Sequence, residues 1–245
     1  MKKNFFICAV ALVVLFTACN NDEDYDEVYY SIGTLSVDGD SNIKAIDSDL
    51  GNVINATNSP KTDLNDGDRA YVQYINLENV AGREDSVYNA DFIYVDGILT
   101  KDIIEINERN ADSIGNDKIY LDNAWFSKGY LNIEFSFWGD SQTHFINMVG
   151  DNSLFSTSKS ANDKSATDTI YLELRHNAYN DYNRTIMSGL ASFRLKSLPY
   201  VSTGQVFAIK YKGFDGIVKT KELVYELSSK EERTSTTVKN KSKIK

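Results

Sequence analysis

The feature that most constrains this chain is a strict alternation of apolar and polar residues over 130–137. This period of two is typical of a β-strand with one buried face, because successive side chains of a strand point to opposite sides. One face carries Leu131, Ile133, Phe135 and Phe137, and the other carries Asn132, Glu134 and Ser136. Segments 169–176, 191–195, 206–211 and 221–227 are similar, and no segment predicts an amphipathic helix longer than about three turns. The chain is therefore expected to be all-β.

The spacing of these segments predicts two domains. Between residues 28 and 106, five short strand-like segments separated by turn signals suit a small antiparallel barrel, of which the OB type is one candidate. The polar segment 105–116 is expected to contain the domain boundary, as one helical turn or a linker. Further segments, at a spacing of roughly 10 to 20 residues, favour a β-sandwich. We predict an OB-like barrel over 28–106 and a β-sandwich over 115–228.

The amino-terminal residues have the organisation of a secretory signal. Lys2 and Lys3 give a positive start, and the apolar run over 5–16 has 12 residues, whereas a helix that crosses a bilayer needs about 20. Small residues precede Cys19 in a pattern that resembles a bacterial lipobox. The resemblance implies that residues 1–18 are removed and that Cys19 carries lipid. The alternative is an ordinary signal peptide with a chance cysteine.

Both ends of the remaining chain are strongly charged. Five carboxylates within 20–27 predict a solvated acidic tether over 19–27. An acidic run after a lipid-bearing cysteine also resembles the export signal of Bacteroides-type lipoproteins, which implies a surface-exposed position on the outer membrane. Segment 229–245 is basic and is expected to be a disordered tail. With a formal net charge of −9, the chain should repel nucleic acid and tolerate cationic partners.

No motif for phosphate binding, metal binding or hydrolase chemistry occurs in the sequence. The two histidines are His144 and His176. Asp181 could orient His176 in a catalytic triad, but the alternation places His176 on the apolar face of its strand, which favours a structural histidine. We expect no catalytic residue, no metal site and no cofactor.

Two other kinds of site residue are suggested by composition. Exposed aromatic side chains could stack on a ligand, although burial in the core is their commoner fate, and the candidates are Trp125, Trp138, Tyr179 and Tyr182. Asp-Ser and Asp-Thr pairs followed by an aliphatic residue look like acceptor sequences for bacterial protein O-glycosylation. They place candidate acceptors at Ser86, Ser113 and Thr169.

Several segments, taken in order, resemble the NigD-like family of lipoproteins. Its first domain is similar to 33–41, to Gly67-Asp68-Arg69 at the start of a strand, and to Ile-Leu-Thr-Lys-Asp over 98–102. Its second domain is similar to the segments 129–133, 144–149, 172–178 and 192–195. The resemblance implies an OB-like domain followed by a β-sandwich, and one role ascribed to the family is bacteriocin immunity. It carries over no catalytic residue.

These observations predict a non-enzymatic surface lipoprotein that binds a protein or peptide. Immunity to a secreted toxin is the most specific form of this hypothesis, and an acidic surface would suit a basic toxin. The alternative is a glycan-binding lipoprotein that serves nutrient capture, which rests on fold analogy. A hydrolase that uses His176 and Asp181 is the third hypothesis. Solvent exposure of Trp125, Trp138 and His176 should help to separate the three.

Overall fold

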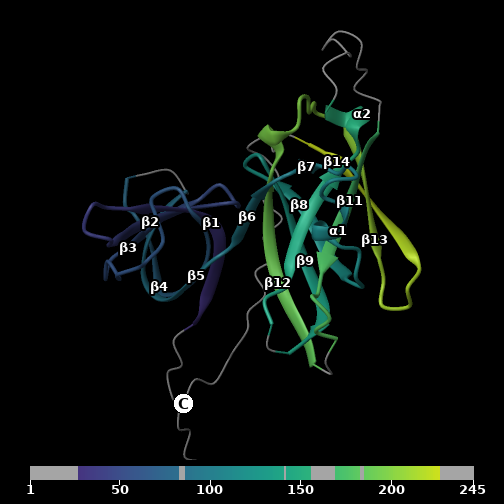
Figure 1. Ribbon diagram of the computed structural model, residues 1–245. Helices are drawn as coiled ribbons and strands as arrows, with labels where there is room; N and C mark the ends of the chain where they lie inside the picture. The colour runs from purple at the N-terminus through teal and green to yellow at the C-terminus, as the bar shows by residue number, and fades with distance from the viewer. Residues whose placement is uncertain (1–26, 83–85, 141, 156–168, 183–184, 227–245) are drawn as a thin grey trace, which may run out of the picture.

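The computed structural model describes residues 27–82, 86–140, 142–155, 169–182 and 185–226. The predicted signal 1–18, the lipidation site Cys19, all but the last residue of the tether 19–27, and the tail 229–245 lie outside these ranges. Within the described ranges, no helix combines the length and the apolar character that crossing a bilayer requires. The fold is all-β, as predicted, with a five-stranded barrel followed by two packed sheets (Figure 1).

The first domain is a closed barrel in which the strands follow the order β1-β2-β3-β5-β4 and β4 pairs back with β1. Neighbouring strands run antiparallel except β3 and β5, which run parallel. Alternate residues of each strand point inward and form one apolar core, which includes the fully buried Ile43, Ile46 and Val72. The strands are β1 (Tyr29–Val37), β2 (Ile43–Ser48), β3 (Val53–Ala56), β4 (Arg69–Asn79) and β5 (Val87–Gly97).

The change from barrel to sandwich is abrupt. Strand β5 ends at Gly97 and β6 begins at Leu99, so Ile98 alone separates them. Strand β6 (Leu99–Asp102) pairs with β12, and β7 (Ile104–Glu105) pairs with β10, so both belong to the sandwich. The sequence had suggested that 98–104 continues the barrel, with a boundary near 106. The structure differs because the partners of β6 and β7 lie far along the chain, where local pattern does not reveal them.

Two sheets form the second domain. One has the order β14-β13-β11-β10-β7, and the other has the order β6-β12-β9-β8. Short helical turns lie between some of the strands: α1 (Ala111–Ile114), α2 (Asn152–Phe155) and η1 (Leu195–Ser197). The remaining strands are β8 (Tyr120–Ser127), β9 (Tyr130–Gly139), β10 (Phe145–Gly150), β11 (Ile170–Asn177), β12 (Thr185–Arg194), β13 (Gln205–Lys212) and β14 (Val218–Tyr225).

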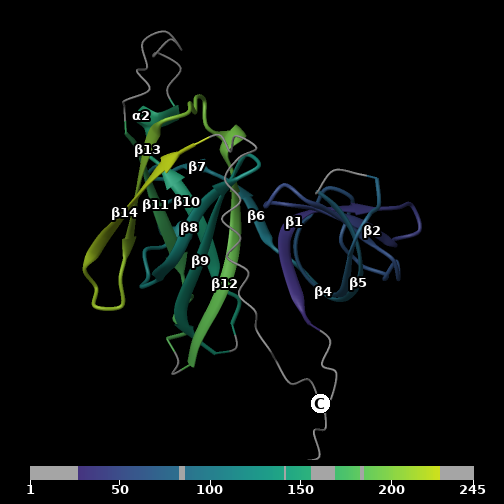
Figure 2. The same cartoon turned by 180° about the vertical axis from the view of Figure 1, so that it is seen from behind.

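The alternation over 130–137 determines how the sandwich packs. Leu131 and Ile133 are fully buried between the sheets, and Phe135 and Phe137 are nearly so. Each aliphatic side chain buried in this way contributes about 1.5–3 kcal/mol. The other face of β9 points away from the core, and its sheet is the one that lies toward the barrel in both views (Figures 1 and 2). The polar face of β9 is therefore available to build an interface between the domains.

Candidate functional site: the interface between barrel and sandwich

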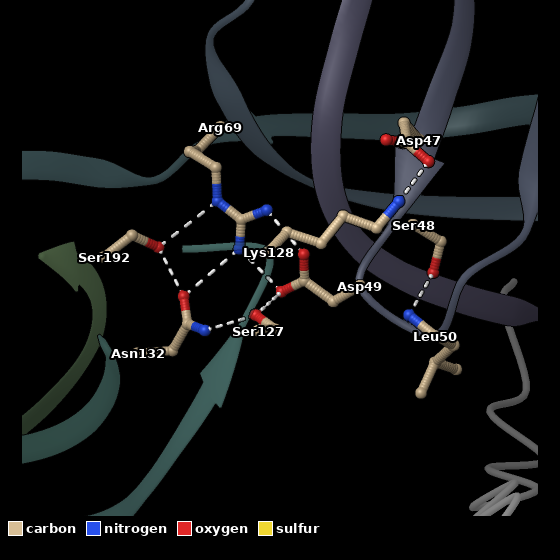
Figure 3. A network of polar contacts seen from close by, with 9 residues as sticks. All are labelled: Asp47, Ser48, Asp49, Leu50, Arg69, Ser127, Lys128, Asn132 and Ser192. Carbon is tan, nitrogen blue, oxygen red and sulfur yellow. Dashed lines mark hydrogen bonds and ion pairs between the residues drawn. The ribbon is translucent and has the colours of Figure 1, made fainter. Parts of the chain in front are cut away.

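Arg69, the first residue of β4, joins the two domains. Its side chain is completely buried and forms a bidentate ion pair with Asp49, with both nitrogen–oxygen distances at 2.6 Å (Figure 3). A buried guanidinium needs such a partner, because leaving a charge unpaired away from water is costly. Both residues belong to the barrel domain, yet the sandwich covers them.

The sandwich supplies the remaining partners of this ion pair. Asn132 Oδ1 accepts hydrogen bonds from Arg69 Nη2 at 3.1 Å and from Ser192 Oγ at 2.7 Å. Asn132 Nδ2 donates to Ser127 Oγ at 2.6 Å, and that hydroxyl donates to Asp49 Oδ2 at 2.6 Å. We call Arg69, Asp49, Ser127, Asn132 and Ser192 the latch (Figure 3). The latch is a hydrogen-bonded network, of the kind that fixes one geometry rather than several.

A second ion pair lies at the rim of the latch. Lys128 Nζ is 2.5 Å from Asp47 Oδ1, and the two side chains are 33% and 50% exposed. Inside the network, the Tyr130 ring lies under the guanidinium, with Arg69 Cζ 4.6 Å from the ring centroid. The aromatic face adds a favourable cation–π interaction to the buried charge. With a single residue joining β5 to β6, this network gives the two domains one defined relative orientation.

Beside the latch the interface is open. A cleft of about 760 Å³ separates the barrel from the outer face of the β6-β12-β9-β8 sheet. Its barrel wall carries three tyrosines, Tyr30, Tyr71 and Tyr94. The Tyr30 and Tyr71 rings stack with their centroids 5.8 Å apart, and Tyr94 meets Tyr71 edge-on at 6.4 Å. The volume is within the range of about 300–1,000 Å³ that is usual for ligand sites.

The sandwich side of the cleft carries polar and acidic side chains beside the apolar Phe135 and Leu190. Glu134 and Ser136 come from the polar face of β9, as the alternation predicted, and Asp122 comes from β8. Ser136 Oγ donates a hydrogen bond to Asp122 Oδ2 at 2.5 Å and lies 3.3 Å from Ser188 Oγ. Asp96 adds a third carboxylate from the barrel.

Charge and ring chemistry together indicate what the cleft can bind. The described residues that line it include three carboxylates and three tyrosines, but no lysine, arginine or histidine. Carboxylates pair with ammonium and guanidinium groups, and tyrosine rings attract the same cations through their faces. The cleft is thus complementary to lysine or arginine side chains of a partner.

The predicted aromatic residues are only partly brought together. Trp138 and Tyr182 line a smaller depression of about 460 Å³ at one end of the sandwich, where Tyr182 Oη donates to Asp117 Oδ1 at 3.3 Å. Trp138 is exposed, as its position on β9 suggested. Tyr179 packs instead on Phe145, with ring centroids 5.3 Å apart. Trp125 is half-buried on β8 and lines neither depression.

His176 is buried, with 1% of its surface exposed, as the alternation predicted. Its Nδ1 lies 2.9 Å from the carbonyl oxygen of Lys118 and therefore donates to it. Its Nε2 lies 2.7 Å from His144 Nδ1, and His144 Nε2 lies 3.4 Å from Asp181 Oδ2. The sequence suggested a direct contact between Asp181 and His176, but His144 stands between them.

This arrangement fits a structural role for the two imidazoles. A neutral His176 that donates from Nδ1 can only accept at Nε2, so His144 donates to it. Burial lowers the pKa of His176, the carbonyl of Lys118 opposes that effect, and His144 adds to it. Within the described part of the chain, no hydroxyl group hydrogen-bonds to either imidazole, and no three histidine, cysteine or carboxylate side chains gather in a way that could hold a metal ion.

The three candidate glycosylation residues differ in accessibility. Ser113 lies exposed on α1, where its hydroxyl donates to the carbonyl oxygen of Asn110 at 2.9 Å. Ser86 and Thr169 are half-buried. Ser113 is therefore the acceptor that a modifying enzyme could reach most easily, and its modification stays a prediction.

Sequence reasoning missed the cleft tyrosines and the latch. Tyr71 lies on β4 opposite to the buried Ala70 and Val72, so its outward direction could have been read from the alternation. The gathering of Tyr30, Tyr71 and Tyr94 on one wall depends on the pairing of β1, β4 and β5. No local signal distinguishes Arg69 from an ordinary polar residue at the start of a strand.

The comparisons with known proteins agree with this fold. The family model described as the NigD-like C-terminal beta sandwich domain matches residues 102–225. Among curated proteins, none matches the chain in sequence.

Solved structures from Bacteroides and Parabacteroides species are similar along almost their whole length. A proposed toxin-related protein from Parabacteroides distasonis is 26% identical with a TM-score of 0.62, covering 82% of this chain and 94% of its own. A protein of unknown function from Bacteroides vulgatus is 24% identical with a TM-score of 0.60, covering 82% and 92%. A NigD-like immunity protein from Bacteroides caccae is 17% identical with a TM-score of 0.56, covering 82% and 98%.

Proposed function

Because the chain belongs to the NigD-like family, we propose that it is a lipid-anchored protein that binds a cationic protein or peptide and performs no chemistry. The cleft beside the latch is the binding site. The observation that carries the proposal is its lining of three tyrosines and three carboxylates, with no basic side chain among the described lining residues. Aromatic side chains and desolvated charge pairs are the groups that dominate the energy of protein interfaces.

Three further properties of the chain support a basic partner. The chain has a formal net charge of −9, which increases the rate at which a cationic partner is encountered. The latch holds the walls of the cleft in place before binding, so little conformational entropy is lost when a partner enters. Tyr30 and Tyr94 are 41% and 50% exposed, so their rings are available to a partner.

Immunity to a secreted toxin is the most specific form of the proposal. One structural relative is named as an immunity protein and another as toxin-related. An immunity protein has to capture its toxin before the toxin reaches its target, and fast electrostatic association suits that task. In this role, the cleft would hold an exposed basic segment of a small toxin.

The anchor completes the proposal. The apolar run and Cys19 support removal of residues 1–18 and lipidation at Cys19, and the acidic run after it supports export to the outer face of the outer membrane. Several acyl chains on one residue give stable anchoring, where a single chain is marginal. The binding site would then stand at the cell surface, where a secreted toxin first meets the cell.

The test uses the mature protein with the substitution Cys19→Ser, immobilised and exposed to secreted protein fractions from sister and competing strains. A panel of glycans and an arginine-rich peptide are applied in parallel. We expect saturable capture of a small basic protein, weak binding of the peptide, and a loss of both as salt increases. The double substitution Asp122→Asn and Glu134→Gln should weaken capture at least tenfold, which is the loss expected for desolvated charge pairs.

A matched control separates the cleft from general acidity. Glu222 lies exposed on β14 and does not line the cleft, so Glu222→Gln removes one charge without changing the site. Capture that falls as much with Glu222→Gln as with Glu134→Gln alone would show that net charge alone is responsible. Saturable glycan binding that is lost on Tyr182→Ala would overturn the proposal in favour of nutrient capture at the smaller depression.

A further inference from the structure

A second surface stands out at the end of the sandwich, next to the cleft. Trp138 contacts Phe214 with ring centroids 6.0 Å apart, and Tyr120 contacts the same ring at 5.9 Å. Ile186 lies beside Trp138 in the register between β12 and β9, and Ile217 is in the same turn as Phe214. We call Tyr120, Trp138, Ile186, Phe214 and Ile217 the aromatic tip.

The tip is unusually apolar for a surface. Ile186 is 53% and Ile217 is 63% exposed, and Trp138 and Tyr120 are exposed by more than a third. Single exposed apolar residues are ordinary, but a contiguous group usually marks a contact surface. Tryptophan and tyrosine among aliphatic side chains are the composition that proteins place at the boundary between lipid and water.

Three lysines lie near the tip, together with the carboxylates of Asp215 and Asp117. Lys219 Nζ lies 5.6 Å from the centroid of the Tyr120 ring and 3.1 Å from Asp215 Oδ2. Lys212 reaches the carbonyl oxygen of Asn116 at 3.1 Å, and Lys118 is exposed in the segment before β8. The nearby carboxylate of Asp117 accepts hydrogen bonds from Tyr182 and from the backbone of Ala178. Lysine side chains in such positions can reach lipid phosphates while their stems stay on apolar surface.

The tip lies on the same side of the molecule as the start of β1. In both views the starts of β1 and β12 and the turn between β13 and β14 point downward (Figures 1 and 2). The start of β1 at Tyr29 lies ten positions after Cys19. A chain of that length spans at most about 33–36 Å. A lipid on Cys19 would therefore hold the start of β1, which lies on the same side of the molecule as the tip, within that distance of the membrane.

We infer that the aromatic tip docks on the lipid surface as a second membrane contact, with the tip's rings and isoleucines among the headgroups and the lysines beside phosphates. The orientation of the tip toward its own membrane rests on the proposed anchor, whereas the affinity of the tip for lipid does not. Docking at two points would fix the direction in which the cleft opens, which a flexible anchor alone cannot do.

The test measures the tip without the anchor. Mature protein with Cys19→Ser and Trp125→Phe retains Trp138 as its sole tryptophan, because the chain has two. It is mixed with vesicles of phosphatidylcholine, with and without phosphatidylglycerol. We expect the Trp138 emission to shift to the blue, to be quenched by brominated acyl chains, and to respond more strongly with the anionic lipid. Ile186→Ser and Ile217→Ser should each lower vesicle partitioning about tenfold, as expected for loss of one buried aliphatic side chain.

Leu50→Ser is the matched control, because Leu50 is 70% exposed in the turn between β2 and β3, away from the tip. It should leave partitioning unchanged. Emission that does not respond to either vesicle would overturn the inference, as would an equal effect of Leu50→Ser. Tip substitutions that weaken capture of the proposed basic partner, and not vesicle binding, would overturn the inference by showing that the tip contacts that partner instead of lipid. Because the protein carries no lipid in this assay, failure of the tip and failure of the anchor or the cleft are distinguishable.

Discussion

The latch and the cleft are two parts of one interface, and they differ in what their polar groups contact. In the latch, a buried guanidinium is surrounded by hydrogen-bond partners from both domains. In the cleft, carboxylates and tyrosines from the same two domains face each other across an open space. Strand β9 contributes to both, with Asn132 in the latch and Glu134 and Ser136 two and four residues further along the same face. The difference shows that satisfying polar groups internally creates rigidity, whereas leaving them open creates a site.

The largest expected effect comes from breaking the latch. Arg69→Ala leaves the carboxylate of Asp49 buried without its cation, which should lower the free energy of unfolding by about 3–5 kcal/mol. The free energy of unfolding is measured by urea denaturation, with tryptophan and tyrosine fluorescence as the signal. Adding Asp49→Leu to Arg69→Met should recover part of the loss, because an apolar pair needs no counter-charge. A loss below about 1 kcal/mol in Arg69→Ala would mean that the network does not hold the domains together.

The next largest effect should be a loss of binding affinity when the tyrosine wall of the cleft is changed. Tyr71 lies between Tyr30 and Tyr94, so Tyr71→Ala removes the centre of the tyrosine wall. We expect a loss of about 2 kcal/mol in binding of the proposed basic partner, or roughly thirtyfold in affinity, as for an aromatic hot spot. Calorimetric titration measures the change. The control substitution is Tyr171→Ala, because Tyr171 is 61% exposed on β11 and lies outside the cleft. The variant should bind the partner with the same affinity as the parent protein.

Lowering the pH should have a smaller effect on stability. This effect arises in the sandwich core and not at the interface between the domains. Burial lowers the pKa of His176 in the folded protein, so below the ordinary histidine pKa of about 6.5 the unfolded chain binds a proton that the folded chain does not. Stability should therefore fall as pH decreases from 7 to 5. His144, Asp181 and Asp117 also face this region, so the comparison is made against His176→Gln. Unfolding curves at several pH values should show a weaker pH dependence in that variant.

The smallest effect should come from the exposed pair at the rim. Lys128→Ala removes the ion pair with Asp47, whose side chains are 33% and 50% exposed. Solvent and salt screen such a pair, so the free energy of unfolding should change by less than about 1 kcal/mol. The same denaturation assay applies, at low and high salt. A loss as large as that of Arg69→Ala would show that charge at the rim, rather than the buried network, holds the domains together.

Much of the fold follows from sequence, because the period of two is a local signal. Apolar and polar residues alternate over 131–137 and 170–176, and the structure buries the apolar members of each set. The assignment of 98–104 to the barrel was wrong for a physical reason. Leu99 pairs with Ala191, and no property of either segment alone specifies that partner. Fold class depends on local periodicity, whereas sheet membership depends on distant pairing.

The site was less accessible to sequence reasoning than the fold. The polar face of β9 was predicted, but its division into a latch and a cleft depends on which residues the barrel covers. Asn132 is fully buried, whereas Glu134 on the same face is exposed, and nothing in either residue's neighbourhood in sequence predicts that contrast. Of the predicted aromatics, Trp138 and Tyr182 line one depression, while the cleft uses three tyrosines that lie on three different strands. Sites that two domains share require the tertiary arrangement.

The direct connection between β5 and β6 has a consequence for the order in which the protein folds. All the strands of the barrel lie within the chain up to Gly97, whereas Thr100 of β6 pairs with Ser192, 92 positions later (192 − 100). As the chain is synthesised from its amino terminus, the barrel can close early, while β6 remains an unpaired edge until β12 is available. Arg69 and Asp49 can already pair within the barrel and stay hydrated during that interval. Covering them with Asn132 and Ser192 would then be a late step, so the two domains would become one unit only when folding is nearly finished.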